Sequence, residues 1–164
     1  MDKILILETK RCDTRALPKG EKLKEEDVKI DTKRHIYAVI EAYKALTEHG
    51  VEQVKKHDHT KLDDLKGFTD ALNTRAVGAE FKKHPWWKKH MTERHHLNDS
   101  VPDDVNLLDV LEMVCDCVCA GMARTGDVYP IEIKPEVLKK AVTNTAELLE
   151  KSIKVVKRKE GTKI

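Results

Sequence analysis

The residues with the clearest chemical potential are histidines and carboxylates placed at intervals along the chain. Divalent metals that activate water prefer imidazole nitrogens and carboxylate oxygens, with at least one coordination position left open. Helical proteins build such centres by directing ligands from several helices to one interior point. The candidates are His35, the pair His57-Asp58, His84 or His90, the pair His95-His96, and Glu112 with Asp116.

Helices are the elements expected to position these side chains. A helix is predicted from Asp31 to Gly50, where Ile36, Val39 and Ile40 share one face and His35 lies at its edge. Further helices are expected over residues 51–56 and 62–73, on either side of the His-Asp pair. Asn106, with Asp109 three residues later, predicts the start of a helix over 107–123. Pro135 fits the first turn of a last helix.

The predicted helix over 107–123 carries an acidic stripe of Asp109, Glu112 and Asp116 on an otherwise apolar segment. One interpretation is an amphipathic helix with its acidic stripe in water. The other is a central helix, whose buried carboxylates need a metal or a cation. We favour the second, because the polar faces of the other helices mix lysine with glutamate and this stripe contains no cation.

The ordered pattern His, His-Asp, His-His, Asp resembles the HD-domain superfamily of metal-dependent phosphohydrolases. His35 matches the first histidine, His57 and Asp58 match the doublet, and Asp116 matches the closing aspartate. Lys61 and the pair His95-His96 resemble the branch with a His-Asp-x-x-Lys motif, although Leu97 stands where that branch has glutamate. The likeness is closest to a small, uncharacterised helical family of phages and bacteria, and it implies an HD-like all-α bundle.

The resemblance also implies roles for these residues. The metal ligands would be His35, His57, Asp58, His95, His96 and Asp116, holding one or two divalent ions (Mn, Fe, Mg or Zn), with His90 and Glu112 as further ligands or supporting residues. Asp58 would also orient the attacking water, and Lys61 would contact a phosphoryl oxygen. Arg94 would attract the substrate, a nucleotide or another small phosphorylated molecule.

Other interpretations remain open at this stage. The metal could be purely structural, with a closed ligand set. The basic region from Lys82 to Arg94 could instead serve a nucleic-acid-interacting accessory protein. His57-Asp58 could be an ordinary polar turn and His95-His96 a solvated loop. The spacing does not decide between His84 and His90, and we expect buried, inert cysteines at 115, 117 and 119 rather than a zinc-thiolate site.

Composition sets the wider frame. The 164 residues are 37% charged and 4% aromatic with a net charge of +2, which favours one helical domain over a sandwich or a dedicated nucleic-acid binder. We divide it into an arm (1–30), a helical core (31–153) and a basic tail (154–164). A small two-stranded element is expected between residues 3–8 and 128–133. No apolar run reaches the roughly 18–20 residues of a membrane span, and the start is unlike a signal peptide, which predicts a cytoplasmic protein.

Overall fold

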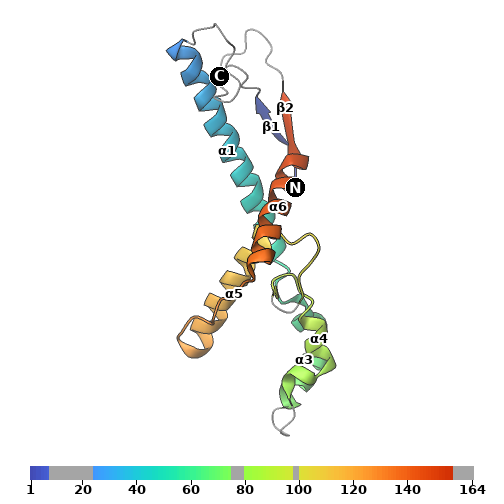
Figure 1. Cartoon of the computed structure of the whole chain (residues 1–164). Coiled ribbons are helices and arrows are strands. Elements are labelled where there is room, and N and C mark those ends of the chain that lie inside the picture. Colours follow the sequence, from blue (N-terminus) through green and yellow to red (C-terminus); the bar gives the residue numbers. More distant parts are fainter. Residues whose placement is uncertain (8–23, 75–79, 98–99, 157–164) are drawn as a thin grey trace. The chain divides into compact units, whose positions relative to one another are not determined.

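The computed structural model describes residues 1–7, 24–74, 80–97 and 100–156. As predicted, helices predominate in this part of the chain (Figure 1). Most of the arm and residues 157–164 of the basic tail lie outside the described residues. In chain order the elements are β1 (Ile4–Leu7), α1 (Glu25–Val54), α2 (His59–Asp63), α3 (Leu65–Asn73), η3 (Phe81–Lys83), α4 (Pro85–His90), α5 (Leu107–Thr125), α6 (Pro135–Ser152) and β2 (Ile153–Val156).

The chain divides into two compact units, so the expectation of a single domain stays a prediction. The first unit comprises Met1–His49 and Leu148–Ile164, and the second comprises Gly50–Glu147. Every candidate ligand except His35 belongs to the second unit. Among the described residues, none of the helices combines the length and the apolar character that crossing a bilayer requires.

The two-stranded sheet lies in the first unit and corrects the predicted pairing. β1 pairs in parallel with β2, with Ile4 opposite Ile153 and Leu7 opposite Val156. The prediction of residues 128–133 as the partner is therefore wrong. Pro130 has no backbone N–H to donate to a ladder, whereas β2 follows α6 directly and is rich in β-branched residues. Residues 154–156, which composition had placed in the basic tail, belong to this strand.

The first helix is longer than the sequence predicted. It begins at Glu25 and passes through Gly50, where a C-terminus was expected, to end at Val54. A Cβ at residue 50 would lie 3.0 Å from Leu108 Cδ2, so this glycine leaves room for the Leu108 side chain and does not end the helix. The predicted starts of the later helices are confirmed. Asn106 and Asp109 form a complete capping box at α5, and Pro135 opens α6.

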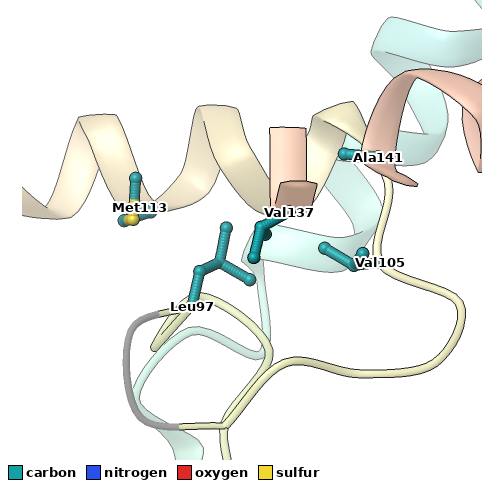
Figure 2. Packing of buried hydrophobic residues seen from close by; sticks show 5 residues of the cluster. All are labelled: Leu97, Val105, Met113, Val137 and Ala141. Carbon is teal, nitrogen blue, oxygen red and sulfur yellow. The ribbon is translucent and has the colours of Figure 1, made fainter. Parts of the chain in front are cut away.

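The apolar core of the second unit lies where α5 and α6 meet the loops that precede α5 (Figure 2). Its buried members are Leu97, Val105, Met113, Val137 and Ala141. Leu97 directly follows His96, and Met113 directly follows Glu112. Burial of these two apolar side chains therefore fixes the backbone beside two candidate ligands.

The segment that leaves α5 turns back across it at Gly121. A Cβ there would lie 2.4 Å from the carbonyl oxygen of Asp127 and 2.6 Å from the amide nitrogen of Tyr129. The same amide donates a hydrogen bond to the carbonyl of Cys117, at 3.2 Å. Only a glycine allows the backbone to approach this closely.

Candidate metal centre

The His-Asp pair lies in the turn between α1 and α2. Asp58 adopts a left-handed backbone conformation with φ of 56°, which aspartate tolerates better than most residues. The turn follows α1 directly, and the carboxylate of Asp58 accepts a hydrogen bond from Lys61 one turn later. Although burial opposes it, this contact lowers the pKa of Asp58, so the carboxylate is charged. An anionic ligand is thereby held at the start of α2.

His84 and His90 lie at opposite ends of α4 and have different surroundings. The ring of His84 caps α4 by accepting a hydrogen bond from the amide of Trp86, at 3.2 Å. His90, at the other end of α4, is 2% exposed and belongs to a group of atoms that could hold a metal with Asp58. The buried ring of Trp86 stacks on His90 with a centroid separation of 5.0 Å. We therefore assign the capping role to His84 and the candidate ligand role to His90.

Three imidazoles and one carboxylate oxygen converge in the second unit. Asp58 Oδ1 lies 3.6 Å from His90 Nε2 and 3.9 Å from His95 Nε2. His96 Nε2 lies 3.1 Å from His90 Nε2. Asp58 Oδ1 and both ring nitrogens of His95 are buried without a hydrogen-bond partner. Since buried polar atoms normally have partners, the facing atoms Asp58 Oδ1 and His95 Nε2 mark a place where a bound group would supply one.

Thr60 and Glu93 determine which nitrogen of His90 is free. The Thr60 hydroxyl donates to Glu93 Oε1 and lies 2.8 Å from His90 Nδ1. A hydroxyl has one proton, so His90 Nδ1–H must donate to the hydroxyl oxygen, which leaves a lone pair on Nε2. Burial lowers the pKa of His90, which keeps the ring neutral. A relay of this kind orients metal-binding histidines.

Glu112 plays the same part for two other histidines. Its Oε1 lies 3.0 Å from His57 Nδ1 and 3.4 Å from His95 Nδ1. His57 Nε2 is left facing Asp116 Oδ1 at 3.4 Å and Asp58 Oδ2 at 3.6 Å. A lone pair between two carboxylates is stable only if a proton or a metal ion lies among them.

The charges of the cluster are unbalanced. Four carboxylates gather here: Asp58, Glu93, Glu112 and Asp116. Within the described residues, Lys61 is the one lysine or arginine whose ion pair reaches any of them. Burial opposes ionisation of Glu112, but its contacts with His95, Gln53 and His57 lower its pKa to about 2. The cluster therefore carries a negative charge that a divalent cation would neutralise.

His96 is a candidate ligand whose ring carries no positive charge that a metal ion would have to displace. Burial, together with the neighbouring His95 and His90, lowers its pKa to about 3, so the ring is neutral at physiological pH. Because His90 Nε2 carries a lone pair, the hydrogen bond between the two rings must be donated by His96. A metal ion would replace that one proton and bind both nitrogens.

The atoms form overlapping groups whose members lie within 4.8 Å of one another. One group contains His57, His95 and Asp116. Another contains Asp58, His95 and His96, and a third contains Asp58, His90 and Glu93. Five of the six predicted ligands, together with the predicted supporting residues His90 and Glu112, are thus brought together.

His35 is the sixth predicted ligand. It is exposed on α1 in the first unit, and the groups found among the described residues do not include it. Its role as a ligand stays a prediction.

Arg94 has a different environment from the one expected of a substrate-binding residue. Its guanidinium donates to both oxygens of Asp109, at 2.7 and 2.8 Å, and to Asp104 at 2.8 Å. The hydrogen bond with Asp109 outweighs burial and raises the pKa of Arg94. This arrangement favours a role in fixing the start of α5 over the predicted contact with substrate.

Sequence reasoning missed Thr60, Glu93 and Gln53. Thr60 lies two residues after Asp58, and Glu93 lies three residues after His90 and two before His95. Their proximity to ligands was the available signal, but their roles depend on hydrogen bonds across 30 or more residues. The prediction of buried cysteines is wrong, because Cys115 and Cys119 are exposed and Cys117 is only half-buried.

Comparison with models of protein families, with curated proteins and with solved structures gives no match.

Proposed function

We propose that this protein is a metal-dependent phosphohydrolase whose centre is the cluster around Asp58. The observation that carries the proposal is the convergence of Asp58 Oδ1 with the Nε2 atoms of His90, His95 and His96, including buried atoms without partners. Asp58 offers one oxygen to this group, and its other oxygen lies 3.6 Å from His57 Nε2, which in turn faces Asp116. The shared carboxylate is compatible with two ions, which in hydrolases lie about 3.5–4 Å apart.

Partial exposure of the ligands favours a catalytic centre over a structural metal. The side chains of His57, Asp58 and Asp116 are 28%, 26% and 30% exposed, whereas His90 and His95 are buried. A structural site is closed, while a catalytic site keeps a position for water or substrate. The exposed side of the cluster offers such a position.

A bound divalent ion would lower the pKa of water, providing a hydroxide near neutral pH, and would offset charge on phosphoryl oxygens. Glu112 orients His57 through a hydrogen bond, and Thr60 with Glu93 orients His90. Lys61, which bonds to Asp58, is the cation available to a phosphoryl oxygen at the same place. The ordered His-Asp and His-His motifs resemble the HD-domain superfamily, which supports the same reaction.

The test measures metal content first and activity second. Wild type, Asp58→Asn and Asp63→Asn are purified identically and analysed for Mn, Fe, Mg and Zn. Asn tolerates the left-handed backbone of residue 58, and Asp63 is an exposed control on α2. We expect metal in wild type and the control, and a large loss in Asp58→Asn. Equal metal content in all three would remove Asp58 from the centre.

The same three proteins are then assayed on a panel of phosphomonoesters, phosphodiesters and nucleotides with each metal. We expect hydrolysis by wild type and the control that a chelator abolishes. A fully loaded wild type that hydrolyses none of the substrates would refute the phosphohydrolase proposal and identify a structural metal instead.

A further inference from the structure

A small cavity adjoins the candidate metal centre. Its volume is about 100 Å³, and one side of it is formed by His95, His96 and Asp116. It lies within the second unit. About 10–15 Å³ open to the centre of a water molecule is enough to hold one water, so this cavity has room for several waters or for a small organic group. A phosphoryl ligand bound beside His95, His96 and Asp116 would have this space for its remaining atoms.

The other walls of the cavity are apolar at the base and acidic at the rim. Leu97 and Met113 line it, and both are core residues with 1% and 6% exposure. Pro130 and Glu132 complete the rim and are exposed. The hydrogen bond from the Tyr129 amide to the Cys117 carbonyl holds this rim segment against α5. The base is therefore rigid, and the rim presents one carboxylate.

The charges around the cavity disfavour a second anionic group. Asp116 and Glu132 both line it, and no lysine or arginine does among the described residues. Bound metal ions would offset the negative charge of one phosphoryl group beside His95, His96 and Asp116. A further phosphate or carboxylate would face Glu132 without a compensating cation, whereas an ammonium group or a hydroxyl would find an acceptor there.

We infer that this cavity is the leaving-group subsite of the proposed phosphohydrolase and selects small phosphomonoesters that carry an amine or another hydrogen-bond donor. The inference rests on the proposed function and narrows its substrate class. It disfavours nucleoside polyphosphates and cyclic dinucleotides, because they carry additional phosphates. Glu132 is the residue that determines the preference.

The test uses binding of phosphonates, which cannot be hydrolysed. Aminomethylphosphonate, ethylphosphonate and phosphonoacetate share a phosphoryl group and differ in charge at the other end. Their affinities for metal-loaded wild type, Glu132→Gln, Glu132→Lys and the control Glu136→Gln are measured by calorimetry. Glu132 and Glu136 are both exposed, so these substitutions do not disturb the core.

We expect wild type and Glu136→Gln to bind aminomethylphosphonate at least tenfold more tightly than phosphonoacetate, with ethylphosphonate between them. Glu132→Gln should reduce that ratio below threefold, and Glu132→Lys should reverse it. An unchanged ratio in Glu132→Gln would overturn the inference while leaving the phosphohydrolase proposal intact. If metal-loaded wild type binds none of the three, phosphoryl recognition itself fails, and both proposals fall together.

Discussion

Asp109 and Asp116 lie on the same helix, two turns apart, and have opposite environments. Asp109 is fully buried and accepts hydrogen bonds from Arg94, from Gln53 and from the amide of Asn106. Asp116 is 30% exposed, and the ion pair found for it is with a histidine, at 3.4 Å. Two carboxylates that look equivalent in the sequence therefore have different partners.

The difference shows how a structural carboxylate can be separated from a metal-binding one. Arginine is always charged, so its pair with Asp109 is complete without an ion. An imidazole is neutral near pH 7 and can exchange a proton for a metal, so a carboxylate surrounded by histidines can still bind a cation. Burial alone does not distinguish the two, since Glu112 is as well buried as many core residues.

The largest expected effect comes from breaking the ion pair between Asp109 and Arg94. Asp109→Asn should lower the free energy of unfolding by about 2–3 kcal/mol, because it leaves Arg94 facing a neutral amide. The value lies at or below the usual cost of breaking a buried pair, because Arg94 is 36% exposed. Chemical denaturation of the metal-free protein measures it.

Asp116→Asn is the matched substitution two turns along α5. It should affect metal binding and leave stability nearly unchanged. Metal content should fall, while the metal-free stability should change by less than about 1 kcal/mol. If Asp109→Asn loses metal but keeps its stability, the contrast between the two carboxylates is wrong.

The hydrogen bonds of Thr60 to His90 and Glu93 offer a sharper test of how His90 is oriented. Thr60→Val keeps the shape but removes the hydroxyl that accepts from His90 and donates to Glu93. Loss of such a supporting hydrogen bond typically weakens metal binding about 10–100-fold. Thr60→Ser restores the hydroxyl and should recover most of the affinity. Competition with a chromogenic chelator measures both variants, and equal affinities for valine and serine would show that the hydroxyl does not act through the metal.

The last test is the pH dependence of the metal-free protein, which needs no bound ion. His96 has a folded pKa of about 3 against an ordinary value of 6.5, so the unfolded chain takes up a proton first as the pH falls. The contribution of His96 to stability should therefore decrease below about pH 6.5. Glu112, with a folded pKa of about 2 against 4.5, adds a further loss only below about pH 4.5.

Unfolding measured between pH 7 and 5 in wild type and His96→Gln isolates the histidine. The variant should show the shallower decline, because it has no imidazole at residue 96 to protonate in the unfolded chain. A steeper decline in the variant would contradict the depressed pKa.

The sequence was informative where local chemistry determines the outcome. The capping box at Asn106, the first-turn Pro135 and the acidic stripe on α5 depend on neighbours within a few residues, and the structure confirms the first two as predicted and buries Asp109 and Glu112. The His-Asp and His-His pairs were found because two adjacent ligand types are conspicuous.

What could not be predicted depends on contacts distant in the sequence. The choice between Asp109 and Asp116 follows from the position of Arg94, and the role of Thr60 follows from a hydrogen bond to Glu93 across 33 residues. The pairing of β1 with β2 joins opposite ends of the described chain. No periodicity or propensity encodes these contacts, because they arise only when the helices pack.

Gly121 has a consequence for engineering the chain. A methyl group there would meet backbone atoms of residues 127–129, which cannot move aside as a flexible side chain would. Gly121→Ala should therefore displace the loop that follows α5 away from the helix. The proposed leaving-group cavity would widen, although neither Glu132 nor any candidate metal ligand had been changed. A position without a side chain would thus act as a spacer that tunes selectivity from a distance.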